Sequence, residues 1–237
     1  MEEQKVVYIT GGSKGIGKGI AKYLLDKGYK VAISSRKIGS VQQAAEDLGG
    51  DAANILCLES DVRRVADEQA AVGNILKKWG RLDVLVANAG LAHFAPIEEL
   101  TSDQWNQVID TNLTGVFNSV KASVEAVKKA KGYIITIASL AGINFSATST
   151  AYNASKFGLV GFTQALMLDL RQKDVKVTTI MPGSVTSHFN GHEPSAEDAW
   201  KIQPEDMGEI VFNLLKMNPR TLPSKIEVRP SKPPVKK

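Results

Sequence analysis

The segment that decides the fold of this chain is Lys5-Val6-Val7-Tyr8-Ile9-Thr10-Gly11-Gly12-Ser13-Lys14-Gly15-Ile16-Gly17. Its first half is a short apolar run typical of a buried strand, and residues 18–25 continue with helical periodicity. Glycines in a strand-to-helix turn let the backbone approach a pyrophosphate, and the helix N-terminus adds free N–H groups and a positive dipole end. We therefore predict a phosphate-binding loop, with spacing Gly-x-x-x-Gly-x-Gly (Gly11, Gly15, Gly17) instead of the longer fingerprint Gly-x-Gly-x-x-Gly.

Strand-like and helix-like segments alternate along the whole chain. The expected strands are 5–11, 30–36, 54–58, 84–88, 132–139, 175–181 and 225–228. The expected helices are 16–27, 41–48, 65–79, 102–118, 120–129, 152–172 and 205–217. Such alternation implies parallel pairing through right-handed crossovers, so we predict an α/β fold with a doubly wound (Rossmann) sheet of seven parallel strands and helices on both faces. Thr101 to Gln104 has the form of a capping box, and Pro204 suits a helix start.

Length and composition indicate one globular domain. The chain has 237 residues, of which 43% are hydrophobic and 23% charged, and it contains no apolar run of 18 residues. We expect a single domain over 1–230 with a basic, disordered tail over 231–237, and no membrane partner or secretory leader. The single cysteine, Cys57, excludes an intrachain disulfide and agrees with a reducing cytoplasm, where we place the protein; we expect Cys57 to be buried and structural.

The basic character of the chain is local. The computed pI is about 9.0, yet the segment from Arg220 to the end carries a net charge of +5 against +4 for the whole chain, so residues 1–219 carry about −1. A short basic terminus is typical of a solvated tail, and we expect no nucleic-acid partner.

A second motif lies near the middle of the chain, where Tyr152 precedes Lys156 by four residues and Ser139 lies thirteen residues before the tyrosine. This spacing puts phenol and ammonium on one face of a helix, so the cation could lower the tyrosine pKa and let it move protons near neutral pH. The same spacing also fits a core aromatic beside a solvated lysine. The phosphate loop at the other end of the chain favours the catalytic interpretation.

Ligands of doubly wound sheets bind beyond the carboxyl ends of the strands. Polar or glycine-bearing residues follow five successive expected strands here: Ser34-Ser35-Arg36-Lys37, Ser60-Asp61-Val62, Asn88-Ala89-Gly90, Ala138-Ser139 and Pro182-Gly183-Ser184-Val185-Thr186. Any one of them could be an ordinary turn. Together with the phosphate loop, they indicate a cofactor site.

These motifs resemble the short-chain dehydrogenase/reductase family over about residues 5–230. The matching residues are Thr10 to Gly17, Asp61-Val62, Asn88-Ala89-Gly90, Asn112, Ser139, Tyr152 with Lys156, Pro182-Gly183 and Thr186. The resemblance implies hydride transfer between a nicotinamide dinucleotide and a carbonyl or alcohol, that is, an oxidoreductase acting on CH–OH groups.

The resemblance also implies roles for single residues. Tyr152 would be the general acid in reduction and the base in oxidation, Ser139 would hydrogen-bond the substrate oxygen, and Lys156 would hold the nicotinamide ribose. Asn112 would complete a water-linked proton relay. The cofactor would lie against Gly11, Ser13, Lys14, Gly15, Ile16, Gly17, Ser35, Arg36, Asp61, Val62, Asn88, Ala89, Gly90, Tyr152, Lys156, Pro182, Gly183, Val185 and Thr186. Two hydroxyl donors aimed at a carbonyl oxygen suit this chemistry independently of the family, because hydride delivery leaves negative charge there.

The end of the second strand predicts the choice of dinucleotide. An NAD site usually places an acid there to bind the ribose hydroxyls, whereas this chain has Ser35 followed by Arg36. Arg36 and Lys14 offer two cations to a 2′-phosphate, so we predict NADP(H) as cofactor.

Substrate identity is poorly encoded in the sequence. In the family, the segment 186–203 closes over the substrate; we interpret His188 and His192 there as loop residues and predict no metal site. Phe145 and His93 could line the pocket. We expect the substrate to be a small carbonyl compound or alcohol. We expect the protein to be an NADPH-dependent ketone or aldehyde reductase, similar to 3-oxoacyl-carrier-protein reductase or sepiapterin reductase. We also expect it to form a homodimer or homotetramer. The alternative is a non-catalytic NADP-binding scaffold on the same fold.

Overall fold

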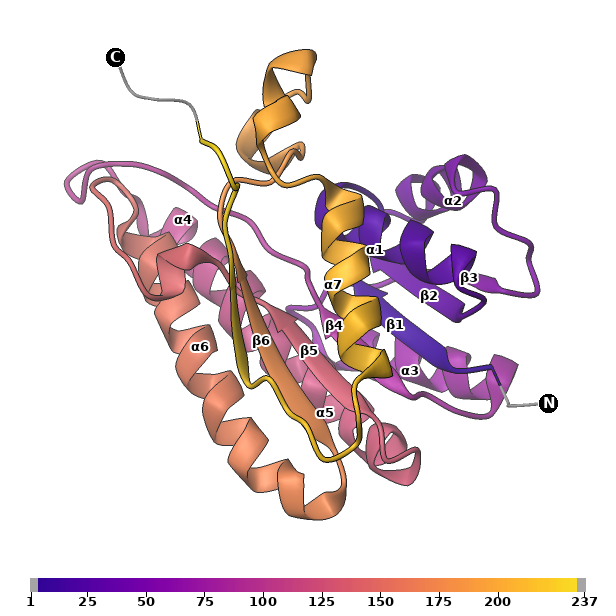
Figure 1. The fold of residues 1–237 in the computed structure, drawn as a ribbon. Coiled ribbons are helices and arrows are strands. Elements are labelled where there is room, and N and C mark those ends of the chain that lie inside the picture. The colour runs from indigo at the N-terminus through magenta and orange to yellow at the C-terminus, as the bar shows by residue number, and fades with distance from the viewer. Residues whose placement is uncertain (1–3, 234–237) are drawn as a thin grey trace.

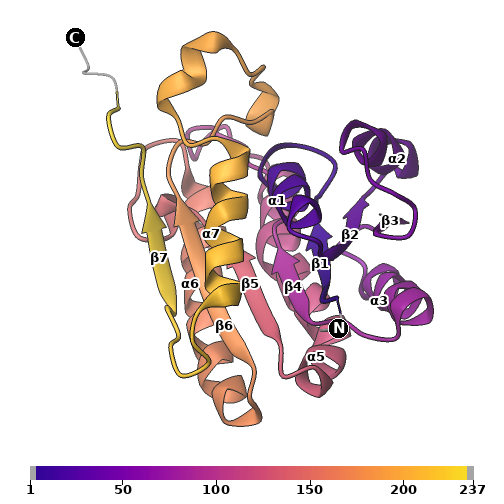
Figure 2. The same cartoon turned by 45° about the vertical axis from the view of Figure 1, so that its right-hand side comes forward.

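The structure, a computed structural model, describes residues 4–233. A seven-stranded sheet forms its centre, and every strand pair is parallel, in the order β3-β2-β1-β4-β5-β6-β7 (Figures 1 and 2). The strands are β1 Val6–Thr10, β2 Lys30–Ser35, β3 Ile55–Glu59, β4 Val84–Ala87, β5 Tyr133–Ile137, β6 Lys176–Pro182 and β7 Lys225–Val228. The predicted Rossmann architecture is confirmed.

Helices cover both faces of the sheet. They are α1 Gly15–Asp26, α2 Ile38–Asp47, α3 Val65–Trp79, α4 Ser102–Ile109, α5 Gly115–Lys129, α6 Thr150–Leu170 and α7 Pro204–Lys216. Helices α1, α2 and α7 share one apolar core with one face of the sheet, whereas α3, α5 and α6 share another core with the opposite face. Alternation along β1 explains how one strand serves both cores: Val7 and Ile9 belong to the first, and Val6 and Tyr8 to the second.

The chain between β4 and β5 departs from the sequence prediction. We expected helices over 102–118 and 120–129, but the interruption comes earlier, as a π-helix over Asp110–Thr114, and α5 runs through residue 119. The hydroxyl of Ser119 donates to the carbonyl of Gly115 at 2.9 Å, so this polar residue is satisfied inside α5. The capping box is confirmed, since Thr101 Oγ1 accepts from the Gln104 N–H and Gln104 Oε1 accepts from the Thr101 N–H.

Cys57 was expected to be buried, and it is only half-buried on β3. Its thiol donates to the Val41 carbonyl at 3.6 Å, and burial raises the pKa of the thiol, with Lys78 acting against the increase. Of the expected tail, residues 231–233 are exposed, and 234–237 lie outside the described residues. Within residues 4–233, no helix is long and apolar enough to cross a membrane.

Helices α1 and α7 pack unusually closely, because each presents a glycine to the other. A Cβ on Gly19 would lie 2.4 Å from the backbone carbonyl carbon of Pro204, and a Cβ on Gly208 would lie 2.4 Å from the Cβ of Tyr23. Pro204 is the first residue of α7. The helix that carries the glycine loop is therefore braced by the start of α7.

This contact predicts a steric penalty for Gly19→Ala. The methyl group would collide with backbone that cannot rotate away, so we expect a loss of about 1–3 kcal/mol in the free energy of unfolding, as for other overpacked sites. A matched control is Gly73→Ala in α3, where nothing lies within 4 Å of the added Cβ. That change should stabilise the protein by about 0.5–1 kcal/mol, because alanine favours helix. Urea unfolding of both variants makes the comparison, and equal effects would contradict it.

Candidate active site

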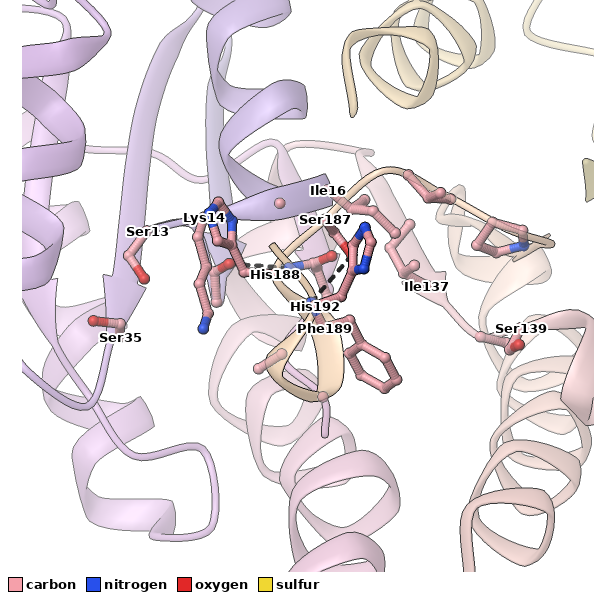
Figure 3. A pocket seen from close by; sticks show the side chains of 18 of the residues that line it. Ser13, Lys14, Ile16, Ser35, Ile137, Ser139, Ser187, His188, Phe189 and His192 are labelled. Atoms are coloured by element: carbon pink, nitrogen blue, oxygen red, sulfur yellow. Dashed lines mark hydrogen bonds between the residues drawn. The ribbon is translucent and has the colours of Figure 1, made fainter. Parts of the chain in front are cut away.

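One cavity of about 520 Å³ lies at the carboxyl ends of the strands (Figure 3). Most of the predicted site residues line it: Gly11, Ser13, Lys14, Gly15, Ile16, Ser35, Arg36, Asp61, Val62, Asn88, Ala89, Gly90, Ser139, Tyr152, Lys156, Pro182, Gly183 and Val185. Segments that are far apart in sequence thus meet at one edge of the sheet, because parallel strands all end on the same side.

Three predicted residues do not line the cavity: Gly17, Asn112 and Thr186. Gly17 has a packing role, since a Cβ there would lie 2.4 Å from the Gly11 carbonyl oxygen. Thr186 is turned toward residues 198–203, where its hydroxyl donates to the Asp198 carbonyl at 3.3 Å and accepts from Gln203 Nε2 at 3.1 Å.

Asn112 supports the site from behind. Its Oδ1 accepts from the Leu91 N–H at 2.9 Å, and its Nδ2 donates to the Leu91 carbonyl at 2.8 Å and to Ser155 Oγ at 3.0 Å. The side chain therefore joins the loop after β4 to α6. The relay role that the family resemblance implies for Asn112 stays a prediction.

The glycine loop is held by Asn88. Its Nδ2 donates to the carbonyls of Thr10 and Gly11, at 2.9 and 3.1 Å, while Thr10 Oγ1 accepts from the N–H groups of Asn88 and Ala89. Gly11 has φ +65°, and a Cβ there would lie 2.9 Å from Ala89 Cα. The loop can therefore take this shape only with glycine at that position.

The loop fits a pyrophosphate. Helix α1 begins at Gly15, and among the described residues no side chain caps its N-terminus. Its first N–H groups are thus free to bind an anion, in the field of the helix dipole. No carboxylate stands in the first turn of α1, where one would repel the ligand.

The end of the cavity next to β2 and β3 is lined by Ser35, Arg36, Ser60 and Asp61. The Asp61 carboxylate accepts from Arg63 Nε at 2.9 and 3.0 Å. Hydrogen bonding from Arg63 lowers the pKa of Asp61, and the positive charge of Arg36 lowers it further. Arg63 was not predicted as a site residue, and the spacing of two residues from Asp61 carries no signal for an ion pair.

Beneath this end lies a buried polar cluster that the sequence analysis missed. Ser60 Oγ donates to Glu68 Oε1 at 2.6 Å, and the Tyr8 hydroxyl donates to the same oxygen at 2.9 Å. Glu68 is fully buried. Burial, followed by the nearby Glu68 charge, raises the pKa of Tyr8 well above its ordinary value.

Lys156 and Tyr152 share one face of α6, as their spacing predicts. Lys156 is buried, and its Nζ donates to the Ile137 carbonyl at 3.0 Å. Burial lowers the pKa of Lys156 to about 8. Its Nζ lies 5.7 Å from the centroid of the Tyr152 ring.

The expected decrease in the tyrosine pKa is not found. Burial raises the pKa of Tyr152, and hydrogen bonding with the Ser139 side chain offsets part of that increase. The fold surrounds the phenol with an interior of low dielectric constant, which the spacing of Tyr152 and Lys156 in the sequence does not reveal. In the protein without ligands, Tyr152 is therefore a protonated hydroxyl at neutral pH, beside Ser139.

Residues 184–203, here called the lid segment, project beyond the sheet (Figure 2). A parallel bridge between Val185 and Ile202 fastens the base of the segment, with hydrogen bonds from Thr186 N–H to the Ile202 carbonyl and from Ile202 N–H to the Ser184 carbonyl. Ser187 reaches the glycine loop, where a Cβ on Gly15 would lie 3.1 Å from its Cβ. The lid segment thus closes one side of the cavity.

His192 is a loop residue, as expected, and it is paired there with a buried carboxylate. The buried carboxylate of Asp198 lies 2.6 Å from His192 Nε2 and 2.5 Å from Lys201 Nζ. These contacts, that of Lys201 first, lower the pKa of Asp198 to about 2. His192, Lys201 and His188 all line the cavity, and Figure 3 shows the two histidines among the side chains that line it. Within residues 4–233 no cluster of His, Cys, Asp and Glu side chains could hold a metal ion.

Two aromatic rings pack against Tyr152 that the sequence analysis did not assign to the site. Phe94, on the loop after β4, lies edge-on with its centroid 5.7 Å from that of Tyr152. Phe189, in the lid segment, is tilted against the same ring, also at 5.7 Å. His93 and Phe145, which we named as candidates for the pocket wall, do not line the cavity. The Nε2 atom of His93 is hydrogen-bonded to Gln107 Oε1 at 3.1 Å instead.

Comparisons with known proteins agree with this arrangement. The family model described as short chain dehydrogenase matches residues 5–198, and the chain belongs to that family. An uncharacterized oxidoreductase of Staphylococcus aureus (strain MW2) is 31% identical over 228 residues, which cover 95% of this chain and 97% of the relative. The protein is thus an oxidoreductase of the short-chain type, acting on CH–OH groups with a nicotinamide cofactor.

Solved structures extend the likeness to the fold. An alcohol dehydrogenase from the archaeon Thermococcus sibiricus, complexed with 5-hydroxy-NADP, has a TM-score of 0.90 at 26% identity, covering 99% of this chain and 100% of the other. A 3-ketoacyl-(acyl-carrier-protein) reductase from Brucella melitensis, complexed with NADH, has a TM-score of 0.87 at 25% identity, covering 97% and 98%. Dinucleotides with and without the 2′-phosphate therefore occur among similar structures.

Proposed function

We propose that this protein is an NADPH-dependent reductase that converts a ketone or aldehyde to an alcohol. The observation that carries the proposal is the placement of Ser139, Tyr152 and Lys156 on the wall of the same cavity that the glycine loop opens into. When bound, the reduced nicotinamide supplies the hydride. The side chains of the protein would stabilise the developing negative charge on the carbonyl oxygen and supply the proton.

The hydroxyl groups of Ser139 and Tyr152 would donate to the carbonyl oxygen as it gains negative charge. The raised pKa of Tyr152 keeps the proton on the phenol until that charge develops, which suits an acid in the direction of reduction. Lys156, whose Nζ donates to the Ile137 carbonyl, would donate to a ribose hydroxyl and would favour the phenolate once the proton has left. Gly90 leaves room beside Lys156, since a Cβ there would lie 3.7 Å from its Nζ.

The proposal is tested with a panel of ketones and aldehydes, monitored by the decrease in NADPH absorbance. Oxidation of the corresponding alcohols with NADP⁺ provides the reverse measurement. Binding of NADPH without turnover of any carbonyl or alcohol would favour the non-catalytic alternative.

We further propose that NADPH is preferred over NADH, on the evidence of charge. Arg36 and Lys14 are exposed cations on the cavity wall, and Ser35 stands where NAD-specific proteins have an acid. Both cations are free to contact a 2′-phosphate through charge-assisted hydrogen bonds.

Arg36→Asp should therefore reverse the preference, because it replaces attraction to the 2′-phosphate by repulsion. The matched control is Lys37→Asp, which makes a charge change of equal size at the next position, outside the cavity. Dissociation constants of NADPH and NADH for the three proteins decide the matter. Equal constants in the unmodified protein would exclude the proposed preference.

A further inference from the structure

Large apolar side chains are exposed around the catalytic tyrosine. Phe94 is 45% exposed and Phe189 is 37% exposed, although both rings pack against Tyr152. They come from two segments that are far apart in sequence, the loop after β4 and the lid segment, and of the two only Phe189 is among the residues that line the cavity. Exposed aromatic surface that converges on a reactive group is typical of a binding surface for an apolar ligand.

The two rings hold different positions relative to Tyr152. Phe94 meets it nearly edge-on, with an interplanar angle of 71°, whereas Phe189 is tilted by 52°. Phe189 is followed by Asn190 and Gly191, whose φ angles of 55° and 78° form a tight left-handed turn. The backbone after Phe189 is therefore bent, and the aromatic ring stands out from the lid segment into the cavity (Figure 3).

The basic side chains on the cavity wall already have carboxylate partners or a proposed role in binding the cofactor. Lys201 and His192 are paired with Asp198, and His188 Nε2 lies 3.7 Å from a carboxylate oxygen of Glu193. Arg36 and Lys14 are assigned to the 2′-phosphate of the dinucleotide in the proposed function. The basic side chains that the structure describes on this wall are thus paired with a carboxylate or assigned to the dinucleotide, to which Lys156 also belongs, so an anionic substrate has to compete for each of them.

We propose that Phe94 and Phe189 form an aromatic clamp, and that the substrates are uncharged ketones or aldehydes with an aryl group next to the carbonyl. The inference rests on the proposed reductase function. The aryl ring would lie against Phe94 and Phe189, and its carbonyl oxygen would reach the hydroxyl groups of Tyr152 and Ser139. Ring stacking of this kind adds to simple apolar burial, so the clamp selects aryl over saturated groups of similar size.

The proposed reduction needs only the carbonyl compound, the reduced dinucleotide and a proton that solvent replaces. The carbonyl carbon gains the hydride from the reduced dinucleotide, the carbonyl π bond becomes a lone pair on oxygen, and that oxygen takes the proton of the Tyr152 hydroxyl. The products are an aryl carbinol, oxidised dinucleotide and a phenolate that is protonated again from solvent.

The test compares three substrates of similar size: acetophenone, cyclohexyl methyl ketone and the anion phenylglyoxylate. We expect the highest kcat/KM for acetophenone. Phe189→Leu and Phe94→Leu keep an apolar side chain but remove the ring, and each should lower kcat/KM for acetophenone by about 3- to 10-fold while changing that for the cyclohexyl ketone by less than about 2-fold. The control is Phe145→Leu, at a ring that is 86% exposed and is not one of the two rings recorded against Tyr152, and this change should affect neither substrate.

Binding of 1-phenylethanol, followed by saturation-transfer NMR in the presence of NADP⁺, separates the clamp from the reductase function. Weaker binding to both clamp variants but not to Phe145→Leu supports the clamp even if no ketone of the panel is reduced, in which case only the proposed reaction fails. The clamp is overturned if the unmodified protein prefers phenylglyoxylate or the cyclohexyl ketone, or if 1-phenylethanol binds all variants equally.

Discussion

We expect Tyr152→Phe to lower the turnover number for NADPH-dependent reduction by about 10²–10⁴, the usual contribution of general acid–base catalysis. The change keeps the ring, and with it the contacts to Phe94 and Phe189. It removes the hydroxyl group that hydrogen-bonds with Ser139 and would donate the proton. Steady-state kinetics on a substrate that the unmodified protein reduces provide the measurement.

Tyr23→Phe is the matched control, because it deletes the same atom from a tyrosine on α1, outside the cavity. Its turnover should equal that of the unmodified protein. Dissociation constants for NADPH should be unchanged in both variants. If Tyr152→Phe binds NADPH normally and reduces its substrate at the unmodified rate, this tyrosine is not the acid.

Lys156→Met should have opposite effects on activity and on stability. Activity falls because NADPH loses its proposed ribose contact and the phenolate loses its stabilising neighbour, which also shifts the pH dependence of alcohol oxidation upward. Stability at neutral pH should rise, because burial lowers the pKa of Lys156 from 10.5 to about 8 and the charged form is thus costly in the folded protein. A pKa shift of this size corresponds to a gain of at most about 3 kcal/mol in the free energy of unfolding. The actual gain is smaller, because the variant also loses the hydrogen bond from Lys156 to the Ile137 carbonyl.

The pH dependence has a definite sign. Between the folded pKa, about 8, and the ordinary value of 10.5, the unfolded chain binds more protons at this lysine than the folded one, so the cost is full below pH 8 and disappears as the pH rises toward 10.5. The stabilisation by Lys156→Met should therefore be largest at pH 7 and shrink by pH 10 in urea unfolding. Lys121→Met, at an exposed position of α5, is the control. A gain that is the same at both pH values would refute the explanation.

The sequence predicted the fold well because the signals for this architecture are local. The apolar run before the glycine loop is a strand buried on both faces, and Val65 to Trp79 has a clear helical period, so β1 and α3 agree with prediction to within one residue. The interruption at Asp110–Thr114 could not be placed in this way. It depends on the bonds of Asn112 to Leu91 and Ser155, which are distant in sequence.

The residues of the candidate site were likewise predictable where local sequence signals determine their positions, and unpredictable elsewhere. Residues at strand ends, such as Asn88 and Ser139, were found because the topology alone determines where they go. Phe94, Phe189 and the pair of His192 with Asp198 were missed because their positions depend on how two irregular segments fold back over the cavity. The direction of the Tyr152 pKa was wrong for a related reason, since the burial of a side chain is a property of the whole fold.

The contact of Pro204 with Gly19 gives the lid segment and the glycine loop a common mechanical support. Pro204 follows the last residue of the lid segment, and Gly19 lies one helical turn after Gly15, where the loop becomes helix. A rigid, close-packed joint of this kind transmits displacement instead of absorbing it. Movement of the lid base and adjustment of the phosphate-binding turn are consequently not independent degrees of freedom.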